Sequence, residues 1–149
     1  MPTAAQVLAA ADRVQARIAA AGGDPGRVRL LAVTKGFPVE VARTALDAGL
    51  VDLGENYAQD LVAKAEALAD AVPAPRFHFI GRLQRNKVKH LAPHVALWQS
   101  IDRLELGAEV ARRAPGAAVL AQVNPLAEPQ KGGCPPDEVP ALVAGLGEL

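Results

Sequence analysis

The sequence predicts an α/β fold made of repeated strand–helix units, and two observations carry this prediction. Short apolar runs typical of strands buried on both faces recur at 30–34, 51–54, 77–80, 96–101 and 118–123. Segments with helical patterns lie before, between or after these runs, at 3–21, 38–49, 57–71, 103–113 and 136–149. Alternation at this spacing indicates βα units and a parallel sheet.

The first helix is predicted over residues 3–21. The Thr3 hydroxyl can cap its N-terminus, and the Gly22–Gly23 pair ends it. Between them, apolar side chains recur at helical spacing, at Val7, Leu8, Ala11, Val14 and Ile18.

The next two helices carry similar signals. Pro38 suits a first helical turn, and Gly49 suits the position just beyond the last turn. The Ala-rich segment 57–71 places Leu61 and Leu68 on one face.

Asp102 and Glu105 are expected to form a capping box for the helix over 103–113, and Pro136 opens a last helix that runs to 149. The five predicted strands leave the topology open. A closed (β/α)₈ barrel needs eight strands and roughly 200 residues or more, whereas a doubly wound sheet can stop at five. No linker or low-complexity tract divides residues 1–149, so one domain is expected.

Composition excludes several classes of protein. The 149 residues suffice for one domain with a core, and no apolar run approaches a membrane span. A formal net charge of zero argues against a general nucleic-acid or membrane-surface binder. Cys134 is the one cysteine, which suits a reducing compartment, so a cytoplasmic protein is expected. Asp12, Arg13 and Arg17 interrupt any secretory signal, and a transit peptide is the lesser alternative.

Lys35 follows the first predicted strand, directly before Gly36. In α/β folds the carboxyl ends of strands carry the chemistry. An amine that is partly removed from water loses its proton more easily, and only the neutral amine attacks an aldehyde. Lys35 is therefore a candidate for Schiff-base formation. The alternative is a surface lysine at a strand end, which position alone favours.

Two other strand ends carry polar candidates. Asn56 and its neighbours Glu55 and Tyr57 follow the second strand and can hydrogen-bond a ligand, although Asn56 can also be a helix cap. His78 and Ile80 face away from the side that carries Phe77 and Phe79. A ligand-facing strand and a core histidine both fit that pattern.

The segment after the third strand is basic, with Arg82, Arg85, Lys87 and Lys89. It is short and lacks interleaved aromatic residues, so a nucleic-acid site is not indicated. Pro93 separates His90 from His94 and disfavours a helical zinc pair, and no metal site is expected. No P-loop or dinucleotide-binding glycine motif occurs.

Taken together, these segments resemble the pyridoxal phosphate homeostasis protein family, in family order and at roughly family spacing. The matching residues are Leu31-Ala32-Val33-Thr34-Lys35, Gly54-Glu55-Asn56-Tyr57 with Gln59, His78-Phe79-Ile80-Gly81 with Leu83-Gln84 and Asn86-Lys87, Ser100-Ile101-Asp102, and Gln122-Val123-Asn124 with Glu128, Lys131 and Gly133. The resemblance implies a TIM-type (β/α) barrel like the alanine racemase N-terminal domain, here about five of its eight units.

The resemblance also implies that Lys35 forms an aldimine with pyridoxal 5′-phosphate, with Asn56 and His78 as further cofactor-binding residues. It implies a protein of intracellular cofactor homeostasis without established catalysis, whose partners include the cofactor and, as an expectation, cofactor-dependent apoenzymes. Arg82 departs from the family's usual histidine at that position, Arg85 from a small polar residue and Thr34 from serine.

The family continues through three further strands, which carry its phosphate-binding loops. A chain of this length is therefore expected to bind the cofactor weakly, and a truncated product with little or no binding is one alternative. Two further alternatives are enzymes. The first is a racemase-like catalyst, for which Tyr57 and His78 are the nearest candidates for a second acid/base group. The second is a Schiff-base aldolase that acts through Lys35.

Overall fold

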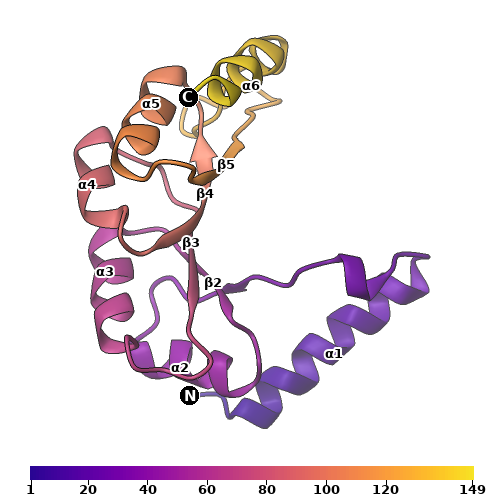
Figure 1. Cartoon of the computed structure of the whole chain (residues 1–149). Helices are drawn as coiled ribbons and strands as arrows, with labels where there is room; N and C mark the ends of the chain where they lie inside the picture. The colour runs from indigo at the N-terminus through magenta and orange to yellow at the C-terminus, as the bar shows by residue number, and fades with distance from the viewer.

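The computed structural model describes residues 1–149 and contains one parallel sheet. Its strands are β1 (Ala32–Val33), β2 (Asp52–Glu55), β3 (Arg76–Phe79), β4 (Val95–Ile101) and β5 (Ala118–Ala121). They pair in the order β1-β2-β3-β4-β5. A doubly wound sheet would reverse its order at a switch point and carry helices on both faces. Here the order is sequential and helices α2 to α6 follow the convex side, so the sheet is an arc of a (β/α) barrel (Figure 1).

The helices are α1 (Ala4–Ala20), α2 (Val39–Asp47), α3 (Ala58–Ala67), α4 (Val88–Leu91), α5 (Leu104–Arg113) and α6 (Val139–Gly147). Short 3₁₀ turns precede β1, α4 and α6, at Pro25–Arg27, Arg85–Lys87 and Pro136–Glu138. None of the helices combines the length and the apolar character that crossing a membrane requires.

The two predicted helix starts that rest on side-chain caps have different outcomes. Thr3 Oγ1 accepts a hydrogen bond from the Gln6 backbone N–H at 3.3 Å, and the Gln6 side chain accepts from the Thr3 N–H at 2.9 Å. The cap at Thr3 is confirmed as a full capping box. The capping box predicted at Asp102 is wrong, because α5 begins after Arg103 without a side-chain cap. Asp102 instead accepts from Arg103 Nη1 at 2.6 Å and from the Gly133 backbone N–H at 3.3 Å.

The apolar core lies between the convex face of the sheet and the helices. It joins strand residues such as Phe77, Phe79 and Trp98 to helix residues such as Leu61 and Leu106, all buried. The Phe79 and Trp98 rings pack in a tilted pair with centroids 6.5 Å apart. Because side chains alternate along a strand, the residues between these face the concave side.

The two edges of the sheet are shorter than their sequence patterns predict. β1 covers Ala32–Val33 where 30–34 was expected, and β5 ends at Ala121 where 123 was expected. Each edge strand has a partner on one side only, and single backbone hydrogen bonds continue beyond both strand ends, from Thr34 N–H to the Gly54 carbonyl and from Gln122 N–H to the Ile101 carbonyl. α1 contacts α2 and extends from the arc like an arm, with Leu8 and Val14 exposed (Figure 1).

Gly81 marks a close approach between the loops that follow β2 and β3. A Cβ atom at this position would overlap the carbonyl oxygen of Asn56, whereas a Cβ at Gly147 in α6 meets nothing within 4 Å. Only glycine therefore lets the two loops pack as they do.

We expect Gly81→Ala to lower the free energy of unfolding by about 1–3 kcal/mol, because a main-chain atom must move to admit the methyl group. The matched control is Gly147→Ala, which should be neutral or stabilising because alanine favours a helix. Urea unfolding of both variants measures the difference. Equal stabilities of the two variants would contradict the close approach.

Glu109 on α5 gathers the arginines of the neighbouring surface. Its carboxylate accepts hydrogen bonds from Arg112 Nη2 at 2.5 Å, Arg112 Nε at 3.2 Å and Arg113 Nε at 3.0 Å. Arg85 Nε lies 3.7 Å away. The hydrogen bonds from Arg112 and then Arg113 lower the pKa of Glu109 from 4.5 to about 2.

A carboxylate whose pKa is lower in the folded chain stabilises the fold above its unfolded pKa. The contribution of Glu109 should therefore be complete above about pH 4.5 and disappear as the pH falls towards about 2. Urea unfolding of the wild type and Glu109→Gln across this range should show a gap in stability that closes in acid. Glu105→Gln, on the same helix, is the control. A gap that is constant with pH would refute the assignment.

Candidate functional site

The carboxyl edge of the sheet brings together the first two predicted site residues. Val33 of β1 pairs with Gly54 of β2, and Gly54 pairs with His78 of β3. Lys35 lies two residues after Val33, and Asn56 lies two residues after Gly54, so the two residues occupy equivalent positions on neighbouring strands. Lys35 is exposed, so the partial removal of its amine from water that the strand-end position suggested is not found. Asn56 is half-buried at the neighbouring strand end, while His78 lies buried in the body of the sheet.

A buried network holds the residue that precedes Lys35. Thr34 Oγ1 donates to Glu55 Oε1 at 2.6 Å, and Lys64 Nζ donates to the Thr34 carbonyl oxygen at 2.8 Å. Lys64 Nζ also forms an ion pair with Glu55 Oε1 at 2.5 Å. The Thr34 backbone N–H donates to the Gly54 carbonyl oxygen, so main chain and side chain of Thr34 are both fixed. Lys35 therefore projects from an anchored backbone.

The network is removed from water. Glu55 is fully buried and Lys64 is 5% exposed. Two charges lose much hydration at such a site, and their attraction offsets that loss only when the geometry is good. Glu55 Oε2 has no hydrogen-bond partner, which leaves one acceptor of the carboxylate unused.

Lys64 was missed as a structural residue, although the sequence holds a signal for it. It lies three residues after Leu61 and four before Leu68, on the face of α3 that those two residues bury. One cation on an otherwise apolar helical face needs a buried acceptor. Its partner Glu55 stands at the end of the preceding strand.

His78 is held at both ring nitrogens. Its Nε2 lies 2.8 Å from Asp52 Oδ1, and its Nδ1 lies 2.8 Å from the Gln99 side-chain amide nitrogen, both at hydrogen-bond distance. Arg29 and Arg76 each place Nε 3.6 Å from the Asp52 carboxylate. These two contacts fix the orientation of the ring between β2 and β4. A ligand contact through His78 stays a prediction.

Two polar cavities of about 480 Å³ each open at the carboxyl edge, and both include Asn56 and Arg82. The first, between the β2 and β3 loops, is lined further by Tyr57, Ala58, Gln59, Phe79, Gln84 and Lys87. The second reaches the loop after β5, with Gln122, Asn124, Lys131 and Gly132 among its lining residues. The alternative in which Asn56 caps the next helix is wrong, because Tyr57 is the cap residue of α3 and no side-chain cap bond forms.

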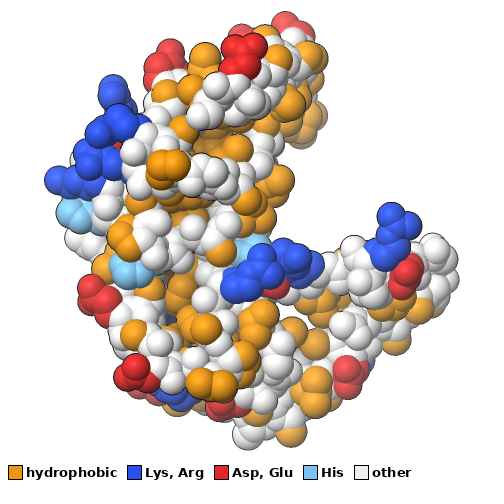
Figure 2. Space-filling model, viewed as in Figure 1, with side chains coloured by type: hydrophobic (Ala, Val, Ile, Leu, Met, Phe, Trp, Pro, Cys, Tyr) orange, Lys and Arg blue, Asp and Glu red, His pale blue; other side chains and the backbone are white.

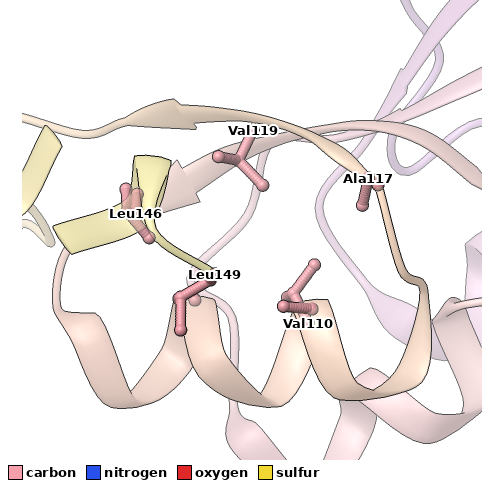
Figure 3. Close-up of a pocket in the computed structure, with 8 residues that line it drawn as sticks. Val110, Ala117, Val119, Leu146 and Leu149 are labelled. Carbon is pink, nitrogen blue, oxygen red and sulfur yellow. The ribbon is translucent and has the colours of Figure 1, made fainter. Parts of the chain in front are cut away.

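A third cavity, of about 190 Å³, lies away from this edge between α5, β5 and α6 (Figure 3). Val110, Val119, Leu146 and Leu149 converge on it, and it is lined by apolar side chains and glycines alone. It therefore offers no polar side chain that would orient a ligand. No cluster of three or more His, Cys, Asp or Glu side chains is placed to hold a metal ion.

Several curated proteins with similar sequences carry the name "Pyridoxal phosphate homeostasis protein". The Pseudomonas aeruginosa protein is 40% identical over all of this chain and 66% of its own length. The Aquifex aeolicus protein is 39% identical over 88% of this chain and 58% of its own length. The Escherichia coli protein is 34% identical over 93% of this chain and 61% of its own length. The chain thus spans about three-fifths of its curated relatives.

Solved structures agree with this result. The crystal structure of an unknown protein from Bifidobacterium adolescentis superposes with a TM-score of 0.84 at 36% identity, covering 98% of this chain and 66% of that one. PipY of Synechococcus elongatus, solved without PLP, gives a TM-score of 0.78 at 31% identity and covers 91% of this chain and 65% of its own. Alanine racemase of Bacillus anthracis, at 20% identity and a TM-score of 0.57 over 94% of this chain and 36% of its own, shares the fold.

No family model matches the sequence. The identity to curated members and the shared barrel arc nevertheless extend over nearly all of the residues, and the chain belongs to the family of pyridoxal phosphate homeostasis proteins.

Proposed function

We propose that this chain binds pyridoxal 5′-phosphate covalently through Lys35 and serves intracellular homeostasis of that cofactor without catalytic turnover. The observation that carries the proposal is an exposed lysine on an anchored backbone at the carboxyl edge of a barrel arc. The names of the relatives support it, as does a PipY structure with PLP bound, which superposes with a TM-score of 0.75 at 30% identity.

Residues at the same edge of the sheet as Lys35 fit the chemistry of this cofactor. Condensation of the Lys35 amine with an aldehyde releases one water molecule and forms a carbon–nitrogen double bond. The Asn56 amide does not cap helix α3, so it can form hydrogen bonds to a substituent of the cofactor ring. Arg82, which lines both cavities at this edge, supplies a cation for a phosphate group.

Two observations favour binding over racemase-like catalysis. A racemase needs a second acid or base that can reach the reacting carbon. Tyr57 is 62% exposed at the start of α3, and no hydrogen bond to a neighbouring side chain activates its hydroxyl. Both ring nitrogens of His78 are already bonded to Asp52 and Gln99. Neither candidate is poised to exchange a proton with a ligand.

We further propose that residues 1–149 act as one domain, a partial barrel, in the cytoplasm. A protein that holds a reactive aldehyde reversibly can pass it to apoenzymes that need it, and such apoenzymes are the expected partners. The exposure of Lys35 supports exchange, because water and incoming amines can both reach the linkage.

Borohydride trapping tests the covalent site. The chain is incubated with pyridoxal 5′-phosphate, reduced, digested and mapped by mass spectrometry. We expect label at Lys35 well above label at Lys89, an exposed lysine with no carboxylate partner, and loss of that label in Lys35→Ala. Equal label at Lys35, Lys87, Lys89 and Lys131 would show unselective amine chemistry and sink the proposal.

The buried pair gives a second test. Lys64→Met leaves the Glu55 carboxylate buried without its cation, which should cost about 3–5 kcal/mol of unfolding free energy. Adding Glu55→Leu removes the unpaired charge and should recover much of that loss. The exposed control Lys89→Met should stay within about 0.5 kcal/mol of the wild type.

Trapping at Lys35 separates positioning from stability in the same variants. The double variant still lacks both hydrogen bonds to Thr34, so we expect its Lys35 label to stay low although its stability recovers. Full label in the double variant would mean that the network stabilises the fold without orienting Lys35.

A further inference from the structure

Charge is segregated along this neutral chain. Lysines and arginines number 16, as do aspartates and glutamates, yet the stretch 71–101 contains no acidic residue. It carries five cations, Arg76, Arg82, Arg85, Lys87 and Lys89. A neutral total therefore hides a strongly positive segment.

The fold places part of this segment beside further arginines on α5. Arg85, Asn86, Lys89, Glu109, Arg112 and Arg113 surround a shallow hollow of about 400 Å³, and we call these six residues the outer basic surface. Figure 2 shows blue side chains gathered on the outer flank over α4 and α5. Four cations and one carboxylate give this surface a net formal charge of +3.

Glu109 organises this surface from beneath. Its side chain is 6% exposed, and it fixes Arg112 and Arg113 through the hydrogen bonds described above. The guanidinium groups remain accessible, with Arg85 71% and Arg112 58% exposed. Lys89 is exposed and has no carboxylate within ion-pair distance. The surface therefore presents ordered cations whose charge is only partly neutralised.

We propose that the outer basic surface docks an acidic segment of a partner protein. Preordered arginines form charge-assisted hydrogen bonds with carboxylates at a small cost in side-chain entropy. None of the lining residues is apolar and the hollow is open, which is unlike the enclosed, mostly apolar sites of small ligands. Complementary charge on such an exposed surface accelerates association and selects the partner.

Other occupants fit less well. A single strand of nucleic acid needs stacking platforms, and this surface has no aromatic side chain. A second copy would have to offer an acidic patch other than this surface. That contact would be head-to-tail, and such contacts build open filaments unless they close into a ring.

The outer basic surface lies on the convex, helical side of the sheet, whereas Lys35 follows β1 at the carboxyl edge. The proposal therefore does not rest on cofactor binding. A partner held at α4 and α5 leaves the edge that carries Lys35 uncovered.

Fluorescence anisotropy with a labelled glutamate peptide of about ten residues tests the proposal, at about 0.02 M salt where surface charges are weakly screened. The variant is Arg85→Ala with Lys89→Ala, which keeps the Arg112 and Arg113 bonds to Glu109. The matched control is Arg13→Ala with Arg17→Ala, which removes the same charge from the exposed face of α1. The same titrations are repeated with a uridylate oligomer of similar length and at about 0.3 M salt.

We expect the peptide to bind the wild type and the control alike, and to bind the Arg85/Lys89 variant about fivefold or more weakly, with the difference shrinking in high salt. Equal weakening in both variants would show attraction by net charge alone and overturn the proposal. So would no binding to the wild type, or tighter surface-dependent binding of the uridylate oligomer. Light scattering that shows self-association through Arg85 and Lys89 would reassign the surface to a second copy.

Discussion

Parallel pairing of neighbouring strands decides where the functional groups of this chain can stand. Because all five strands run the same way in sequential order, their carboxyl ends meet at one edge. The convex face is buried beneath helices and filled by residues such as Phe77 and Trp98. A ligand can therefore reach side chains at the carboxyl edge or on the concave face, and Lys35 and Asn56 both lie at that edge.

Next to Lys35, the layer between the sheet and the helices contains a buried ion pair, formed by Glu55 and Lys64. Replacing such pairs by apolar residues is often neutral or stabilising, so stability alone does not account for it. The geometry offers another account, since both partners also bond Thr34. The pair joins α3 to the end of β2 and to Thr34, the residue before Lys35. Hydrogen bonds fix the relative orientation of these segments more closely than apolar contacts would.

Local signals in the sequence suffice for some of these features. The apolar runs predict the strands, and they place Lys35 at the end of the first one, because strand ends are marked within a few residues. The partners of His78 are beyond such signals, since Asp52 and Gln99 lie 26 and 21 residues away and no periodicity relates them. Their contact depends on the register of three strands, which side-chain alternation alone does not give.

Competition for one group explains why the predicted cap of α5 is absent. Asp102 has the right spacing to Glu105, yet its carboxylate is taken by Arg103 and by the backbone N–H of Gly133, 31 residues later. Lys64 is a different case, because its place between Leu61 and Leu68 is visible in the sequence. The apolar members of this helical face predict its burial, whereas the single charge among them predicts a buried acceptor on the sheet.

Average composition conceals what the fold does with charge. A net charge of zero argues against general electrostatic binding, but that argument holds only if opposite charges are mixed. Here the nearly buried Glu109 lies beneath Arg112 and Arg113, so the solvent-exposed surface is more positive than the net charge of its residues suggests. The sheet then separates the two proposed kinds of contact: covalent chemistry at the carboxyl edge, and charge recognition on the helices outside it. A partner can be held without covering Lys35, which transfer of a reversibly bound ligand requires.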